Sequence, residues 1–268
     1  MPLTSMILSP WRQRSLIAIL TRREIQGRYR GSALGMAWPV ITPLFMLAVF
    51  TLVFGVVFES RWASGADEPT GMFALRVFAG MLVHGLLAEA LGKAPSLVTS
   101  QPGYVTKVVF PLEALGWVNL LAAVFHFAIG LGLLVVANGV WGTGFAPAQL
   151  ALPGIMVPYL LLLLGVSWML AALAVYLRDI GQAVGPLVMV AMFLGPVFFP
   201  RASMPAPLQP WLLLNPVTVP IEQARASLFE GMWPDAGTMA VYWLVSIAVY
   251  ALGLWMFSTL KRGFADVL

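Results

Sequence analysis

The stretch WPVITPLFMLAVFTLVFGVVF, residues 38–58, contains 21 residues and no charged side chain. A helix needs about 20 mostly apolar residues to cross the hydrocarbon core of a bilayer. Because a helix satisfies its own backbone hydrogen bonds, such a run is stable in lipid while its side chains stay apolar. Residues 38–58 therefore predict a transmembrane helix.

The composition extends this prediction to the whole chain of 268 residues. Hydrophobic residues make up 60% of it and charged residues only 10%, whereas charged residues make up about 25% of a typical soluble domain. The charges gather in short clusters between long apolar stretches. We find no internal repeat and no second domain, so residues 1–268 predict a single all-α transmembrane domain.

Five further apolar stretches predict spans. They lie at residues 77–92, 115–137, 152–176, 183–199 and 239–260. The stretch 77–92 is the weakest of them, because it contains His84 and Glu89. With residues 38–58, the chain is expected to have six transmembrane helices.

The placement of Lys and Arg predicts the orientation, because cytoplasmic loops carry an excess of both. With a cytoplasmic N-terminus, the cytoplasmic segments hold eleven basic residues: Arg12, Arg14, Arg22, Arg23, Arg28, Arg30, Lys93, Lys107, Arg178, Lys261 and Arg262. The outer segments then hold four: Arg61, Arg76, Arg201 and Arg225. The bias predicts that both termini are cytoplasmic. The first apolar run is too long for the hydrophobic region of a signal peptide, so we do not expect a cleaved signal.

Residues 10–30 combine apolar and basic side chains ahead of the first span. This pattern is typical of an amphipathic helix that lies in the membrane interface, with Trp11 as an anchor. The alternative is a basic tail that only sets the topology. The apolar spacing favours the helix.

Two other segments do not span. The cytoplasmic loop at 93–113 is broken by Pro95, Pro102 and Gly103, and it offers a docking surface or a passive connection. The outer segment at 200–235 is apolar and repeatedly interrupted by proline, which favours a stretch that enters the outer leaflet and returns. Within it, Glu222 and Arg225 lie three residues apart on one helical face.

The sequence offers no sign of catalysis. Zinc-protease, serine-hydrolase and phosphate-binding-loop motifs are absent, as are cysteines, and two histidines leave little for a metal site. We therefore expect no catalytic residue, no metal, no cofactor and no nucleic acid bound by this chain. An ATP-driven activity would need a partner.

Two polar residues lie inside predicted spans, and the sequence allows more than one role for each. Glu89 is costly in a membrane and is functional by default, or it forms a structural pair with Lys93 one turn later. His126 stands alone in the third span, where hydrogen-bonded helix packing is the simpler interpretation.

Four short elements occur in order along the chain. They are TRREIQGRYRGSALGMAWPVITPL at 21–44, KVVFP at 107–111, RDI at 178–180, and Asn215-Pro216 followed by Glu222, Arg225 and Gly231. Together they resemble the permeases of ABC-2-type polysaccharide exporters over residues 21–262. Each element is weak alone, but their order, the topology and the length agree.

The resemblance implies a homodimer that assembles with two copies of a separate cytoplasmic subunit, which binds ATP and Mg. It implies a lipid-linked polysaccharide as substrate (capsule, O-antigen or teichoic acid), moved outward across the bacterial inner membrane. Periplasmic or outer-membrane export proteins are further partners that the resemblance leaves open.

The resemblance also suggests residues for each role. Those expected to couple the chain to the ATPase are Arg23, Glu24, Pro95, Ser96, Leu97, Gln101, Gly103 and Lys107. In the family, the first and fifth spans line the channel, so the expected pathway residues are Phe45, Phe54, Met192, Phe193, Phe198, Phe199, Arg201 and Arg225. Aromatic rings stack on sugars and guanidinium groups pair with phosphate, while lipid contact is the alternative for each ring. Two other functions stay open: an exporter of small hydrophobic drugs or lipids, and a non-transporting membrane scaffold.

Overall fold

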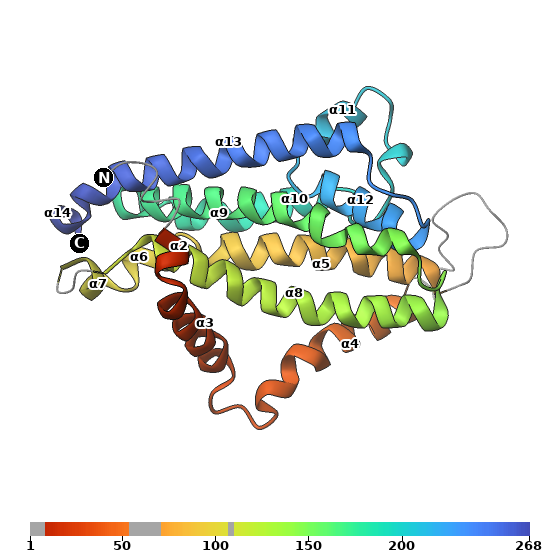
Figure 1. Ribbon diagram of the computed structural model, residues 1–268, viewed down its shortest axis with the longest axis horizontal. Helices are drawn as coiled ribbons and strands as arrows, with labels where there is room; N and C mark the ends of the chain where they lie inside the picture. Colours follow the sequence, from red (N-terminus) through yellow and green to blue (C-terminus); the bar gives the residue numbers. More distant parts are fainter. Residues whose placement is uncertain (1–8, 54–70, 107–109) are drawn as a thin grey trace.

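A computed structural model describes residues 9–53, 71–106 and 110–268, and this part of the chain contains helices and no strand. Four long helices run side by side along the bundle: α5 (Met72–Lys93), α8 (Glu113–Trp141), α9 (Leu152–Tyr176) and α13 (Ala236–Leu260) (Figure 1). The short helices α2 (Ser9–Arg12), α6 (Ser96–Thr99), α7 (Pro102–Thr106) and α14 (Phe264–Val267) gather at one end, which we call the terminal end. At the opposite end lie α11 (Gln209–Leu212) and α12 (Thr218–Phe229).

Helices α5 and α9 form the interior of the bundle, since more than half of the apolar stretch of each is buried within the chain. Two buried polar side chains tie α9 to its neighbours. The Tyr159 hydroxyl donates to the carbonyl oxygen of Val83 at 3.0 Å, and the Trp168 indole donates to that of Glu113 at 3.2 Å. Each satisfies a polar group that would otherwise be buried at a cost.

Glycine allows α9 and α13 to touch along their backbones. A Cβ atom added at Gly253 would lie 2.1 Å from the carbonyl oxygen of Gly165. Small residues at such a crossing bring helices close enough for dense packing, which is a main source of helix association in lipid.

The first span stands apart from this core. Helix α4 (Trp38–Phe50) packs on α5 and α8, but most of its side chains are exposed. Between the basic helix α3 (Arg14–Tyr29) and α4, the chain turns sharply through η1 (Gly35–Ala37), so that the two helices form a V against the bundle (Figure 1).

The described residues contain five helical segments long and apolar enough to cross a membrane. These are Gly35–Val53, Met72–Lys93, Glu113–Trp141, Pro147–Tyr176 and Ala236–Val267. They coincide with five of the six predicted stretches, apart from residues 54–58, which lie outside the described part of the chain. The multi-pass membrane class predicted from the sequence is therefore confirmed.

The predicted span at 183–199 takes a different form. Its helix, α10 (Ile180–Phe193), has 14 residues and is about 21 Å long at 1.5 Å per residue. That length is shorter than a hydrocarbon core of about 30 Å. Gly195 and Pro196 follow the helix, and the chain turns there instead of continuing as a helix to residue 199.

The segment at 200–235 folds as short helices joined by proline-rich turns: η4 (Arg201–Ser203), α11 and α12. Glu222 and Arg225 lie on a helix as expected, in α12, which packs against α5 and α9. Two further 3₁₀ turns, η3 (Pro147–Ala151) and η5 (Lys261–Gly263), flank α9 and α13.

Candidate functional site

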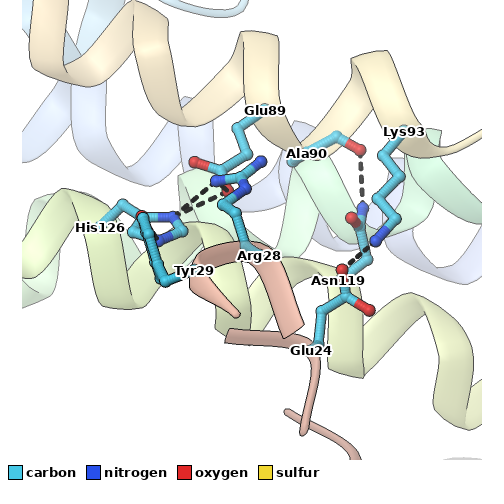
Figure 2. A network of polar contacts seen from close by, with 8 residues as sticks. All are labelled: Glu24, Arg28, Tyr29, Glu89, Ala90, Lys93, Asn119 and His126. Carbon is cyan, nitrogen blue, oxygen red and sulfur yellow. Dashed lines mark hydrogen bonds and ion pairs between the residues drawn. The ribbon is translucent and has the colours of Figure 1, made fainter. Parts of the chain in front are cut away.

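Helix α3 is held to the bundle by a polar cluster, which we call the α3 cluster: Glu24, Arg28, Tyr29, Glu89, Lys93 and His126 (Figure 2). Glu24 and Arg28 are four residues apart on α3 and therefore lie on one face of it. On the other side of the contact, α5 supplies Glu89 and Lys93, and α8 supplies His126. The cluster thus joins three helices.

Within the α3 cluster, Glu89 is the centre of a charged triad. The Arg28 guanidinium donates to Oε1 of Glu89 at 2.6 Å, and Nδ1 of His126 lies 2.8 Å from the same oxygen. One turn further along α5, Lys93 forms an ion pair with Glu24. The structural alternative of a Glu89–Lys93 pair is therefore wrong, because both residues find partners on α3 instead.

Both ring nitrogens of His126 have polar neighbours. Nδ1 lies 2.8 Å from Oε1 of Glu89 and 3.1 Å from the Arg28 guanidinium, and Nε2 lies 2.8 Å from the Tyr29 hydroxyl. A proton on Nδ1 is donated to Glu89, whereas a bare Nδ1 accepts from Arg28. Burial, opposed by Arg28, raises the pKa of Tyr29, so this hydroxyl is a proton donor at neutral pH. His126 is a hydrogen-bonded packing residue, as its sequence context suggested, and it also joins a charged network.

The loop predicted to couple the chain to an ATPase has a buried and an exposed side. Pro95 and Leu97 are buried, and α6 packs on α8 and α9. Ser96 and Gln101 are exposed, and Gly103 is half-buried. Leu97 therefore belongs to the core of the chain and is not available for docking, whereas Ser96 and Gln101 are. Lys107 lies outside the described residues.

At the opposite end of the bundle, Arg225 sits in a site built from backbone oxygens. Its side chain is buried, with 4% exposed, and it donates to the carbonyl oxygens of Arg76 at 2.9 Å, Val197 at 2.6 Å, and Pro196. A Cβ atom at Gly80 would lie 2.5 Å from its Nη2. This glycine leaves the room that the guanidinium fills.

The expectation that Arg225 faces a substrate needs correction. Its guanidinium is already bonded to carbonyl oxygens that follow α10, inside a single chain, and is not on a surface that an anionic group reaches. It therefore holds α5, α12 and the turn after α10 together. Near it, Arg201 pairs with Glu222 at 3.2 Å and Arg76 pairs with Glu230 at 3.1 Å.

The remaining predicted pathway residues lie on two separate helices and the turn after one of them. Phe45 on α4 is 64% exposed and Phe193 on α10 is 52% exposed. Phe193 packs near Phe198, with ring centroids 6.2 Å apart, and Met192, Phe199 and Arg201 are half-buried. Phe54 lies outside the described residues. Since α4 packs on α5 and α8 while α10 packs on α5 and α9, the chain presents these rings on two distinct surfaces.

Among the residues that the structure describes, no three His, Asp or Glu side chains are grouped so that they could hold a metal ion. The Glu89–His126 pair brings together two such groups, with the Arg28 guanidinium occupying the neighbouring position. The positive charge of Arg28 disfavours a cation there.

Five long apolar helices with a basic helix ahead of the first define a multi-pass membrane protein. The chain belongs to the ABC-2 type transporter family, whose sequence profile matches residues 15–229. The resemblance drawn from the four sequence elements is thereby confirmed at the level of the family.

Three curated relatives are similar to the chain over nearly its full length, and each is named O-antigen export system permease protein RfbA. The protein from Myxococcus xanthus is 26% identical over 258 residues, which cover 96% of this chain and 96% of that protein. Two proteins from Klebsiella pneumoniae are 23% and 20% identical over 255 residues, which cover 94% of this chain and 95% of each.

Proposed function

We propose that the chain is the channel-forming permease subunit of an ATP-driven exporter that moves a lipid-linked polysaccharide outward across the bacterial inner membrane. The observation that carries this proposal is the similarity, over 94–96% of the chain, to three proteins named as O-antigen export permeases. Membership of the ABC-2 type transporter family supports it.

The proposed topology has six passes and cytoplasmic termini. Helices α2 and α14 lie at the same end of the bundle (Figure 1), which supports an even number of crossings. With five long apolar segments, the proposal assigns the sixth crossing to α10, which leads from the terminal end toward α12. In this proposal α10 and residues 194–199 cross together, and α11 and α12 form an outer segment that enters the membrane and returns.

The turn after α10 is acceptable at that depth because Gly195, Pro196 and Val197 are buried in protein. Backbone that leaves the helix within a membrane must be buried in protein or line a wet cavity. Here Arg225 donates to the carbonyl oxygens of Pro196 and Val197, and Val197 is fully buried. The interior role of Arg225 thus supports a crossing made by a short helix.

The proposed assembly is a homodimer with two copies of an ATP-binding subunit, which carries ATP and Mg. Large apolar side chains are exposed along α4 and α10: Leu44, Phe45, Met46, Leu187, Met189 and Phe193. Two copies that bring α4 of one chain toward α10 of the other would enclose a pathway lined by Phe45, Met192, Phe193, Phe198 and Phe199. In such a pathway, aromatic rings offer faces on which sugars stack.

In the proposed coupling, the partner subunit docks at the terminal end against exposed Ser96 and Gln101 and against α3. Movement of α3 would reach the spans through the Arg28–Glu89 and Glu24–Lys93 pairs. Arg23 is exposed on α3, the helix against which the partner would dock, whereas Glu24 is paired with Lys93 within the chain.

Deleting the gene in its host tests the function. Loss of the permease should abolish the surface polysaccharide and leave its lipid-linked form on the cytoplasmic face, and the wild-type gene should restore display. The readout is surface polysaccharide by antibody or lectin, with the lipid-linked form measured in the membrane fraction. Unchanged display, with no accumulation, would reject polysaccharide export and favour a hydrophobic small molecule or a scaffold role.

A further inference from the structure

Two cavities meet beneath α3. The first, of about 420 Å³, lies between α4, α5 and α8. The second, of about 1150 Å³, lies between α3 and the chain that follows α5. Arg28 and Tyr29 contribute to the walls of both cavities, so the two lie next to each other.

The first cavity has the dimensions and the lining of a site for a hydrocarbon chain. Along α4 it extends from Trp38 to Phe50, which is about 18 Å at 1.5 Å per residue. One leaflet contributes about half of a hydrocarbon core of about 30 Å. The cavity is mainly apolar, and its charged groups, Arg28 and Glu89, lie at the end beside the second cavity.

The second cavity carries an excess of positive charge. Its walls include Arg23, Arg28, Arg30, Lys93 and a single carboxylate, Glu24. Glu24 is paired with Lys93, and Arg28 is paired with Glu89. Arg23 and Arg30 are exposed, and neither forms an ion pair with another residue in the described part of the chain. Two guanidinium groups therefore remain for an anion.

We propose that the two neighbouring cavities together bind one anionic phospholipid, with its phosphate at Arg23 and Arg30 and one acyl chain between α4 and α5. Guanidinium groups match phosphate in charge and geometry, and the anionic surface of a membrane attracts basic segments beside its spans. In the orientation proposed above, the site opens to the cytoplasmic leaflet. The lipid fills the space inside the V of α3 and α4 and supports the loosely packed first span.

The headgroup half of the proposal is tested by lipid retention. The chain is reconstituted in nanodiscs of mixed phosphatidylglycerol and phosphatidylcholine, extracted in mild detergent and examined by native mass spectrometry. The wild type should retain one phosphatidylglycerol. Arg23→Gln with Arg30→Gln should lower its affinity about tenfold for each guanidinium lost. Arg22→Gln is the matched control, because Arg22 is exposed on α3 but lines neither cavity.

The acyl-chain half is tested by filling the apolar cavity. Gly85 lines it, and a Cβ atom there meets nothing within 4 Å. Gly85→Leu should therefore occupy the cavity without straining the fold and should prevent retention of the lipid. Gly92→Leu is the control, since Gly92 also lies on α5 in open space but lines neither cavity.

Three results would overturn the proposal. They are equal retention of phosphatidylcholine and phosphatidylglycerol by the wild type, retention that is unchanged in the Arg23/Arg30 and Gly85 variants, and displacement of phosphatidylglycerol from the wild type by a polyprenyl phosphate. The last result would assign the cavities to a transported lipid carrier. The experiment measures lipid retention and not export. A negative result would therefore reject the lipid site without bearing on the proposed export function.

Discussion

The two ends of the bundle are tied by arginines in different ways. At the terminal end, Arg28 meets other side chains: its own is 49% exposed and that of Glu89 is 22% exposed. At the opposite end, Arg225 is buried and donates to three backbone carbonyl oxygens. Side-chain pairs near water exchange partners at little cost, whereas a buried guanidinium that satisfies backbone oxygens does so only at a large cost.

From this difference we expect the terminal end to be the one that moves when a partner binds. The α3 cluster joins helices through pairs that can re-form with water or with a partner protein. The Arg225 site joins α5, α12 and the turn after α10 through buried hydrogen bonds from the guanidinium to backbone carbonyl oxygens. We therefore expect substitutions at the Arg225 site to act on stability and those in the α3 cluster to act mainly on coupling.

The largest effect is expected from Arg225→Met. This change leaves the carbonyl oxygens of Arg76, Pro196 and Val197 buried without the guanidinium, which should cost about 3–5 kcal/mol of folding stability. The measurement is thermal unfolding in detergent, together with the yield in membranes. Arg178→Met is the control, because Arg178 is exposed and should change stability by less than about 0.5 kcal/mol. Equal melting temperatures for both variants would contradict the assigned role.

Gly80→Ala should have the next largest effect. The added methyl group would lie 2.5 Å from Nη2 of Arg225 and 2.8 Å from the carbonyl oxygen of Val197, so overpacking should cost about 1–3 kcal/mol. Gly85→Ala on the same helix meets nothing within 4 Å and should be neutral or slightly stabilising. The melting temperatures of the two variants are compared by thermal unfolding. A lower melting temperature for Gly85→Ala than for Gly80→Ala would contradict the tight packing assigned to the Arg225 site.

A smaller effect on the free energy of unfolding is expected from substitutions in the α3 cluster. A double-mutant cycle of Arg28→Met and Glu89→Gln should give a coupling energy of about 0.5–1.5 kcal/mol, because the pair is partly exposed. The measurement is the unfolding free energy of the four proteins in detergent. Strict additivity of the two single changes would show that Arg28 does not tie α3 to α5.

The smallest effect is expected from Glu24→Gln. Both side chains of the Glu24–Lys93 pair are more than one third exposed, so the stability should fall by less than about 0.5 kcal/mol and by less at high salt. Melting curves at low and high ionic strength measure the loss of stability and its dependence on salt. A loss as large as that of Arg225→Met would remove the distinction between the two ends.

The sequence predicted the long elements of this fold well. Five apolar stretches became long helices because each is a continuous run with few charges, which is a local property. For 183–199 the sequence predicted an apolar helix but not where that helix ends. Gly195 and Pro196 follow the last helical turn, and Arg225 of α12, distant in sequence, bonds to the turn there.

The polar sites were harder to predict, because their partners are far apart along the chain. Arg28 and Glu89 are separated by 61 positions, and Arg225 and Arg76 by 149. Spacing rules compare neighbours on one helix, so they suggested Glu89 with Lys93 and Glu222 with Arg225. A sequence signal was available for one site: Glu89 and His126 are ionisable residues in predicted spans, and such groups seek partners.

The central claim is that this chain is the permease of an ATP-driven exporter. The most direct test of that claim is whether the chain co-purifies with an ATP-binding subunit. We would purify the tagged chain from its native membranes in mild detergent and quantify the accompanying proteins by mass spectrometry. The account predicts an ATP-binding subunit in an amount equal to that of the chain. Recovery of the chain alone in several mild detergents would contradict it.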